Sequence, residues 1–323
     1  MSAVATQPVL DVRNLCVSFG ATRVLDGVSM SVGAGEVVGG VGESGSGKSM
    51  TALAVMGLLP PGASVTGGSV RLRAGERDVD VVSLRERERR GLRGRHVAMI
   101  FQEPMTSLNP VFSVGEQITE VLALHRGLGG RAARVEAAAL LERVGISEGR
   151  SRLGAYPHEF SGGMRQRVMI AMALAGNPGL LLADEPTTAL DVTVQARVLD
   201  LIDEIRTERQ LGVMLISHDL GLIGQRASHV YVMLRGRVVE EASAGVVLRE
   251  PRHPYTRALL ASAPRLGAKR ARLTTIGDAA AHDRAIAGMD SGLAWWPGDE
   301  GQGVLNEVSP GHRVLVLSGR ETS

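Results

Sequence analysis

The chain has 323 residues, enough for one large domain or for a domain with an appendage. Its 36 Lys and Arg residues nearly balance its 34 Asp and Glu residues, so charge gives no case for a nucleic-acid partner. The single cysteine, Cys16, excludes an internal disulfide and any metal site built from several cysteines, as is typical of a reducing compartment. The N-terminus lacks a secretion signal, and no apolar stretch approaches the roughly 20 residues needed to cross a bilayer. We therefore expect any membrane role to be peripheral.

The first part of the chain predicts strands. Between residues 9 and 41, apolar residues alternate with polar ones in segments separated by Gly20 and by Gly33-Ala34-Gly35. Val37, Val38 and Val41 then indicate a buried strand. Gly39 and Gly40 make this strand unusually small, which the sequence does not explain.

The most informative segment follows that strand. Residues 42–49 read Gly-Glu-Ser-Gly-Ser-Gly-Lys-Ser and match G-x-x-x-x-G-K-[ST], a loop whose backbone N–H groups surround nucleotide phosphates. Lys48 is expected to reach the β- and γ-phosphates, and the Ser49 hydroxyl to bind Mg²⁺. The apolar residues 52–56 predict a helix whose positive N-terminal end faces the same phosphates and which Pro60-Pro61 ends.

The same residues also match the glycine pattern of dinucleotide-binding proteins. Gly40, Gly42 and Gly45 fit G-x-G-x-x-G, but that site needs an acidic residue about 20 positions further on to hold the ribose. No acidic residue lies between Glu43 and Glu76, and the pattern gives the Lys-Ser pair no role. The sequence therefore favours the phosphate loop.

The remaining elements alternate between strands and helices. The charge-dense segment 85–95 interleaves Arg and Glu and predicts a solvated helix face in preference to a polyanion site. Residues 97–101 predict a strand, and the pattern is helical from 114 to 175. Residues 180–183 and 213–216 are typical of buried parallel strands. This alternation predicts an α/β layer fold with its sites at the carboxyl ends of the strands, and the long helical stretch predicts an inserted subdomain.

Two further segments carry chemistry. Asp184 and Glu185 end a buried strand, where the first could hold Mg²⁺ through water and the second could polarise an attacking water. Without a phosphate loop, such a pair would more often cap the following turn. Ser161 precedes Gly162-Gly163 as the N-cap of a helix, whose N-terminus is a candidate second anion site. With one phosphate loop in the chain, the nucleotide bound there could belong to another molecule.

Taken together, these motifs resemble those of ABC-type ATPases. Segment 42–49, Gln102, segment 161–163, segment 181–185, segment 189–191 and His218 occur in the order found in that family. Four longer segments, 101–110, 156–167, 183–195 and 253–260, resemble the ATP-binding subunits of oligopeptide, dipeptide and nickel importers. The likeness covers about residues 8–265, and it accommodates Met164 where many ABC proteins have Gln.

The resemblance implies a fold and a division into domains. It implies an α/β ABC-type P-loop ATPase over residues 1–250, with a RecA-like core, an N-terminal antiparallel β-subdomain and an inserted helical subdomain over about 107–175. Residues 251–323 would form a short C-terminal extension, importer-like at its start and atypical after that. The family's extension usually carries four cysteines for an iron–sulfur cluster. This extension has none, so no cluster is expected and the fold of residues 266–323 is left open.

The resemblance also implies a role for each site residue. Glu185, His218 and Gln102 would be catalytic, as the base, the switch that contacts the γ-phosphate, and the sensor of γ-phosphate and Mg²⁺ on a loop that also meets the membrane partner. Phe19 would stack on adenine, and Asp191 would cross a dimer interface. The nucleotide would be bound by Phe19, Gly42, Ser44, Gly45, Gly47, Lys48, Ser49, Met50, Gln102, Ser161, Gly162, Gly163, Asp184 and Asp191. Mg²⁺ would be held by Ser49, Gln102 and Asp184.

The function implied is ATP hydrolysis that powers an importer of peptides or of a related small solute such as nickel. The chain would lie on the cytoplasmic face of the inner membrane with two permease subunits, a second ABC ATPase chain and an extracytoplasmic substrate-binding protein, and without nucleic acid. The alternative is a soluble ABC ATPase of DNA repair or translation. Such proteins typically need a long coiled-coil insertion, zinc cysteines or tandem ATPase domains, which this sequence does not show. A regulator without turnover is disfavoured because Glu185 and His218 are both present.

Overall fold

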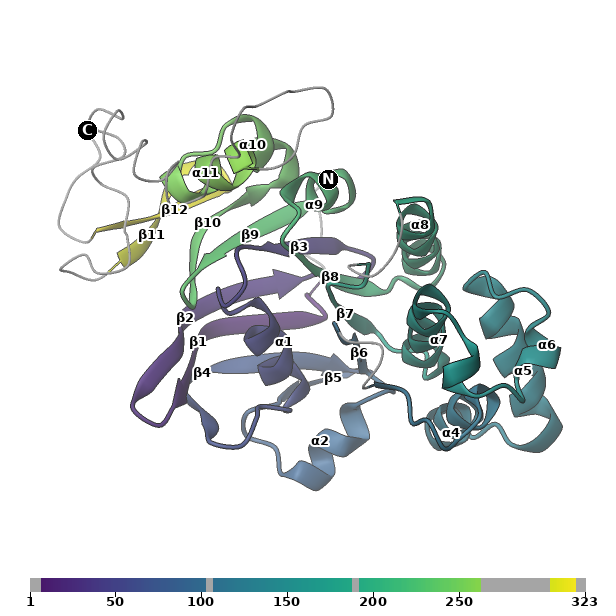
Figure 1. Ribbon diagram of the computed structural model, residues 1–323. Helices are drawn as coiled ribbons and strands as arrows, with labels where there is room; N and C mark the ends of the chain where they lie inside the picture. The colour runs from purple at the N-terminus through teal and green to yellow at the C-terminus, as the bar shows by residue number, and fades with distance from the viewer. Residues whose placement is uncertain (1–6, 103–106, 188–191, 263–302, 318–323) are drawn as a thin grey trace, which may run out of the picture.

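Two β-sheets organise the computed structural model, which describes residues 7–102, 107–187, 192–262 and 303–317 (Figure 1). The smaller sheet has four strands in the order β2-β1-β4-β5 and is antiparallel. Its strands are β1 (Leu10–Phe19), β2 (Thr22–Val32), β4 (Ala63–Ala74) and β5 (Arg77–Asp80). The larger sheet has eight strands in the order β11-β12-β10-β9-β3-β8-β7-β6. The predicted α/β fold with an N-terminal antiparallel sheet is confirmed.

Five parallel strands form the larger sheet from β9 to its β6 edge. They are β3 (Val37–Val41), β6 (Val97–Ile100), β7 (Leu180–Asp184), β8 (Gly212–Ser217) and β9 (His229–Leu234). β3 lies between β8 and β9, and β7 lies between β8 and β6. Nearly every residue in these strands is buried, because protein covers both faces of the sheet and only apolar or small side chains fit there.

Each face of this sheet has its own hydrophobic core. Leu180 and Leu182 of β7 point into the core that holds α1 (Lys48–Met56) and the smaller sheet. Leu181 and Ala183 point into the opposite core, which holds the helices that come later in the chain. α1 therefore lies on one face of the sheet (Figure 1), and α7 (Gly162–Ala175) lies on the other.

The predicted helical stretch forms a bundle beside the β6 edge of the sheet (Figure 1). It comprises α4 (Val114–Arg126), α5 (Gly130–Arg143), α6 (Gly149–Arg152), the short 3₁₀ helix Pro157–Glu159, and α7. Ser113 begins α4 with a capping box, in which its hydroxyl accepts from the Glu116 N–H and the Glu116 carboxylate accepts from the Ser113 N–H at 2.7 Å.

The small residue Gly39 allows α9 (Leu220–Arg226) to pack closely on β3. A Cβ at Gly39 would lie 2.1 Å from Cγ2 of Ile223, which is far inside van der Waals contact. A Cβ at Gly40 would make only ordinary contacts, so close packing explains Gly39 and nothing in the structure explains Gly40.

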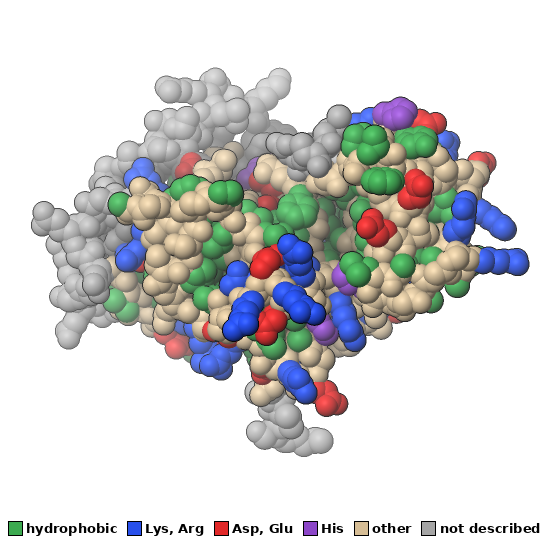
Figure 2. Space-filling model, turned by 90° about the horizontal axis from the view of Figure 1, so that it is seen from below, with side chains coloured by type: hydrophobic (Ala, Val, Ile, Leu, Met, Phe, Trp, Pro, Cys, Tyr) green, Lys and Arg blue, Asp and Glu red, His purple; other side chains and the backbone are tan. Residues whose placement is uncertain are grey.

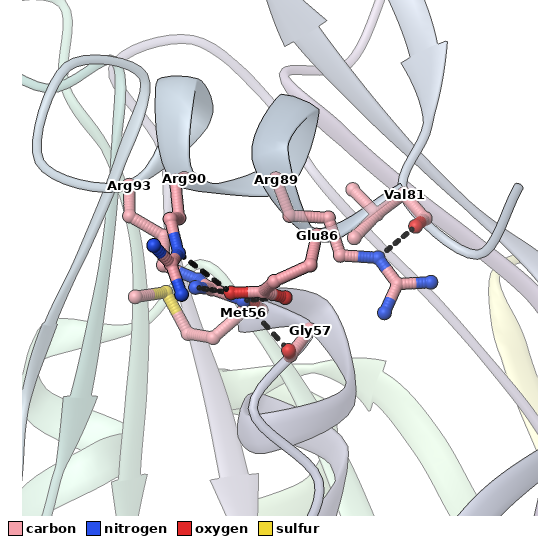
Figure 3. Close-up of polar contacts among 7 residues, drawn as sticks. All are labelled: Met56, Gly57, Val81, Glu86, Arg89, Arg90 and Arg93. Atoms are coloured by element: carbon pink, nitrogen blue, oxygen red, sulfur yellow. Dashed lines mark hydrogen bonds and ion pairs between the residues drawn. The ribbon is translucent and has the colours of Figure 1, made fainter. Parts of the chain in front are cut away.

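The charged segment 85–95 forms α2 (Glu86–Leu92), but it is not only a solvated face. Arg85, Arg87 and Arg90 are exposed, as predicted. Arg89 turns inward and donates to the carbonyl oxygens of Val81 and Val82, each at 3.0 Å. Arg93 donates to the carbonyls of Met56 at 2.9 Å and Gly57 at 2.7 Å, which end α1 (Figure 3). Arg93 therefore fixes α2 to the end of α1, and Arg89 fixes it to the segment that follows β5.

The C-terminal part of the chain returns to the larger sheet. β10 (Arg237–Ser243) is followed by α10 (Ala244–Arg249) and α11 (Pro254–Ser262). The predicted strand near residues 313–317 is confirmed as β12 (His312–Leu317), which pairs with β10 and with β11 (Gly303–Ser309). Between β11 and α11, residues 263–302 lie outside the described part. α8 (Val192–Arg209) completes the helices, and within the described ranges none is both long and apolar enough to span a membrane.

Candidate nucleotide-binding site

The carboxyl ends of four parallel strands lie side by side. The strand register pairs Val41 with Ser217, Asp184 with Ile216, and Ile100 with Ala183. The segments that follow these strands therefore meet at one edge of the sheet, as the α/β pattern predicts. The phosphate loop follows β3, Gln102 follows β6, Glu185 follows β7 and His218 follows β8.

The phosphate loop needs glycine at two of its positions. Gly42 has φ of 153°, and a Cβ there would lie 2.3 Å from the Met233 carbonyl oxygen. Gly47 has φ of 109°, and a Cβ there would lie 2.7 Å from Cδ2 of Leu25 in β2. Any other residue would strain the backbone at both positions and clash with its neighbours. The loop thus packs directly against β2 and β9.

Lys48 lies inside this loop. It is 5% exposed and donates to the carbonyl oxygens of Gly42 at 2.7 Å and Glu43 at 2.8 Å. Burial lowers the pKa of Lys48, while the nearby carboxylates, Glu185 first, act in the opposite direction. Lys48 is the first residue of α1, and the carbonyl oxygens of the loop surround its ammonium group.

Asp184 has the features of a magnesium-binding residue. Its side chain is 4% exposed, and its Oδ1 has no hydrogen-bond partner. Burial raises the pKa of Asp184, while the neighbouring Ser49 hydroxyl acts to lower it. A buried carboxylate oxygen without a partner, next to a hydroxyl at the start of α1, fits a hard cation that prefers oxygen ligands. The residues present therefore suit Mg²⁺.

Glu185 is where two other predicted residues converge. The Gln102 amide donates to Glu185 Oε2 at 3.3 Å, and His218 Nδ1 lies 3.3 Å from Glu185 Oε1. Glu185 has φ of 46°, an uncommon conformation for a residue with a side chain, and its N–H donates to the Ile216 carbonyl at 3.0 Å. The carboxylate is thus held at a fixed place between the ends of β6 and β8.

Other predicted residues lie elsewhere. Phe19 ends β1, and its side chain is exposed beside Gly62. Ser161 caps α7 by accepting from the Met164 N–H at 3.3 Å, and it is exposed together with Gly162. Asp191 is outside the described residues. Ser44 and Gly45 are exposed in the phosphate loop, and Met50 lies in the first turn of α1.

Two residues of structural importance carry no chemical motif in the sequence. Gln166 of α7 is buried, and its amide donates to the Pro186 carbonyl at 2.7 Å, directly after Glu185. The hydroxyl of Tyr255 in α11 accepts a hydrogen bond from the Glu43 N–H at 2.8 Å. Both lie in segments that resemble the importer family, and that resemblance was the only signal that could have pointed to them.

Comparisons with known proteins agree with this geometry. The family model described as ABC transporter matches residues 25–188, and that of the oligopeptide/dipeptide transporter C-terminal region matches residues 239–290. A putative peptide import ATP-binding protein of Brucella melitensis is 49% identical over 82% of this chain and 80% of its own length. The dipeptide transport ATP-binding protein DppD of Bacillus subtilis is 47% identical over 84% and 81%.

A solved structure supports the same fold. The ATP-binding cassette MJ0796, dimeric and bound to ADP and Pi in a post-hydrolysis state, has a TM-score of 0.65 to this chain and is 26% identical to it. The match covers 73% of this chain and 98% of that one. The uncovered part of this chain is therefore additional to a complete cassette.

Proposed function

This chain belongs to the family of ABC transporter ATP-binding proteins, and we propose that it powers peptide import through a site that it shares with a second ATPase chain. It hydrolyses ATP, as its family does. The single observation that carries the proposal is the convergence of Gln102 and His218 on Glu185, next to the phosphate loop.

The site residues divide into those that bind and those that act on water. Lys48 and the N–H groups of the phosphate loop bind the phosphates, and Phe19 offers an exposed ring for adenine. Ser49 and Asp184, with Gln102, would hold Mg²⁺, which neutralises charge that develops on the phosphates. Glu185 accepts hydrogen bonds and so orients the attacking water and draws its proton away. Gln102 and His218 hold that carboxylate in place.

A second chain completes the nucleotide-binding site. α1 and α7 pack on opposite faces of the sheet, so the helix N-terminus at Ser161 and the phosphate loop of one chain do not share a cavity. Ser161 and Gly162 are exposed, with helix N–H groups available for an anion. The partner's phosphate loop supplies that anion, and the partner is either another copy or a related ATPase subunit.

A groove next to Gln102 is the docking site for the permease subunits. It has a volume of about 460 Å³ and is lined by Met56, Met99, Met169, Met172, Phe101 and His125. These side chains come from α1, β6, α4 and α7, so the groove lies where the bundle meets the sheet. Methionine side chains adapt to an apolar helix face. Phe101 precedes Gln102, so a helix seated here acts directly on the residue that holds Glu185.

The rim of this groove is basic. Arg95 is exposed beside the groove residue Gly94, and Arg90 of α2, which pairs with Glu86 at 3.3 Å, lies near the groove residue Met56 (Figure 3). Burial, and then Arg95, lowers the pKa of His125. Figure 2 shows arginine side chains, with acidic side chains among them, gathered on this face next to hydrophobic surface. The docked permease segment is therefore an amphipathic helix that carries at least one acidic residue.

The solute is a peptide, because the relatives named above are described as peptide and dipeptide import ATP-binding proteins. The match to the oligopeptide/dipeptide transporter C-terminal region supports the same class. A nickel transporter remains the related alternative. In either case the chain lies on the cytoplasmic face of the membrane, with the permeases and a substrate-binding protein.

Two variants test the shared site. Lys48→Ala removes a phosphate-binding charge and should abolish ATP binding. Ser161→Arg should retain ATP binding within about twofold, because the phosphate loop of its own chain is intact, but it should block hydrolysis in the partner's site. ATP binding is measured by equilibrium dialysis, with an excess of partner chain in which residues 161–163 are unchanged. Loss of ATP binding in Ser161→Arg would show that both motifs act within one chain and would refute the shared site.

A further inference from the structure

We propose that Tyr255 is a positioning residue through which the C-terminal extension sets the conformation of the phosphate loop. The inference rests on the proposed role of segment 42–49 in binding ATP. It assigns a function to α11, which follows the part of the chain that matches the ABC transporter family model.

Tyr255 contacts the base of the loop. It is 1% exposed, and its hydroxyl accepts from the Glu43 N–H at 2.8 Å, although 212 positions separate the two residues in sequence. Burial raises the pKa of Tyr255, so the hydroxyl stays neutral throughout the physiological range. Glu43 lies between Gly42 and Ser44, where the backbone turns from β3 into the loop.

This hydrogen bond fixes the direction of the peptide group. The Glu43 N–H points toward α11, and the carbonyl of the same peptide group, that of Gly42, accepts from Lys48 Nζ at 2.7 Å. Rotating this peptide group would break both the hydrogen bond to Tyr255 and the hydrogen bond from Lys48. Tyr255 therefore stabilises the arrangement that keeps Lys48 and the following N–H groups in place.

A buried network holds α11 itself. The Glu240 carboxylate in β10 accepts from the backbone N–H groups of Arg252 at 2.7 Å and His253 at 2.9 Å. His253 Nδ1 in turn accepts from the Tyr255 N–H at 3.1 Å, which fixes the first turn of α11. His312 of β12 lies 2.7 Å from Glu240 through its Nε2. Glu240 is fully buried, so these contacts leave the start of α11 little freedom to move.

Removal of the hydroxyl should reduce the population of the competent loop. In Tyr255→Phe the ring still fills its place, but the partly buried Glu43 N–H loses its partner, which costs about 1 kcal/mol unless the loop rearranges. A loop that is competent in only about 10–20% of molecules raises the apparent Kd by roughly fivefold to tenfold. Once ATP is bound the loop is ordered, so the rate at saturating ATP should change by less than about twofold.

Tyr231→Phe is the matched control. Tyr231 is 5% exposed, and its hydroxyl accepts from the Ser31 N–H at 3.0 Å, in β2. The two variants lose the same chemical group from a buried tyrosine that accepts from a backbone N–H. Both should lower Tm by a similar amount, whereas only Tyr255→Phe should raise the Kd and KM for ATP.

The experiment uses the full chain and compares four proteins. ATP Kd, KM, kcat and Tm are measured for the parent, Tyr255→Phe, Tyr231→Phe and Lys48→Ala. A rise in Kd and KM confined to Tyr255→Phe and to Lys48→Ala supports the proposal.

An unchanged Kd in Tyr255→Phe, with ATP binding lost in Lys48→Ala, overturns the role of Tyr255 and leaves the assignment of the phosphate loop intact. An equal rise in both tyrosine variants also overturns it, because destabilisation alone would then explain the effect. Normal ATP binding by Lys48→Ala would refute the phosphate loop itself, and with it the inference.

Discussion

We expect the Asp184 carboxylate, which we propose as a ligand of Mg²⁺, to destabilise the nucleotide-free protein. Its carboxylate is buried, one oxygen has no partner, and burial raises its pKa. The ionised form is therefore less favourable in the folded protein than in the unfolded one. We predict that Asp184→Asn raises the stability of the nucleotide-free protein and at the same time abolishes Mg²⁺-dependent hydrolysis.

The expected gain in folding stability follows from the free energy that the buried, unpartnered Asp184 carboxylate costs the folded protein. An unpartnered buried polar atom costs about 1–3 kcal/mol, and asparagine leaves a neutral polar group in the same place, so we take the lower end. A gain of about 1 kcal/mol corresponds to a rise in Tm of roughly 2–4 °C for a domain of this size. Loss of a metal-binding carboxylate should lower the hydrolysis rate by at least 10²-fold, on the order expected for a positioned catalytic group.

The pH dependence gives the sharper measurement. Because the pKa of Asp184 is raised in the folded protein, the parent binds its proton more tightly when folded, and both states are protonated well below the ordinary value of about 3.9. The stability advantage of Asp184→Asn should therefore be smallest in acid, grow as pH rises through the folded pKa, and then level off. Tm measured with a chelator between pH 4.5 and 8 tests this. An advantage that is constant with pH, or a less stable variant, would refute the reasoning.

Two further predictions concern hydrolysis and the C-terminal extension. Glu185→Gln should bind ATP normally but hydrolyse it on the order of 10²-fold more slowly or worse, because water activation is lost while Asp184 is intact; retention of most of the parental rate in a phosphate-release assay would place the base elsewhere, with His218 as the next candidate. Because residues 251–323 contain no cysteine, the purified protein should carry no iron–sulfur chromophore, and broad absorbance near 400 nm with stoichiometric iron, about one cluster per chain, would contradict this expectation.

The fold could be predicted wherever a local pattern carries it. The buried strands β3, β7 and β8 are short apolar runs, and the phosphate loop fixes where the first of them ends. The reason for Gly39 could not be predicted, because it depends on Ile223, which is 184 positions away and packs on β3 only in the folded chain. The inward direction of Arg93 could not be predicted for the same reason. A run of charged residues predicts a solvated helix face, and the sequence does not show that the end of α1 lies next to Arg93.

The sequence names the candidate site residues but could not predict their contacts. The motifs identified Gln102, Glu185 and His218 as separate candidates. Only the strand register shows that Gln102 and His218 both contact the Glu185 carboxylate. Tyr255 illustrates the opposite case. Its segment was recognised by resemblance, but a tyrosine has no motif for binding a distant backbone N–H. Long-range hydrogen bonds of this kind leave no local signal in a single sequence.

The arrangement of α1 and α7 links the site to the groove that we propose for the permease. The C-terminal end of α1 at Met56 and the apolar side chains Met169 and Met172 of α7 line the same groove, and each helix begins at a different half of the ATP site that we propose. Arg93 donates a hydrogen bond to the Gly57 carbonyl at the end of α1, next to this groove. Gln166 of α7 donates to the carbonyl of Pro186, the residue after Glu185. A permease helix in the groove, as we propose, would contact both elements at once, so binding of the permease and closure over ATP would act on the same pair of helices.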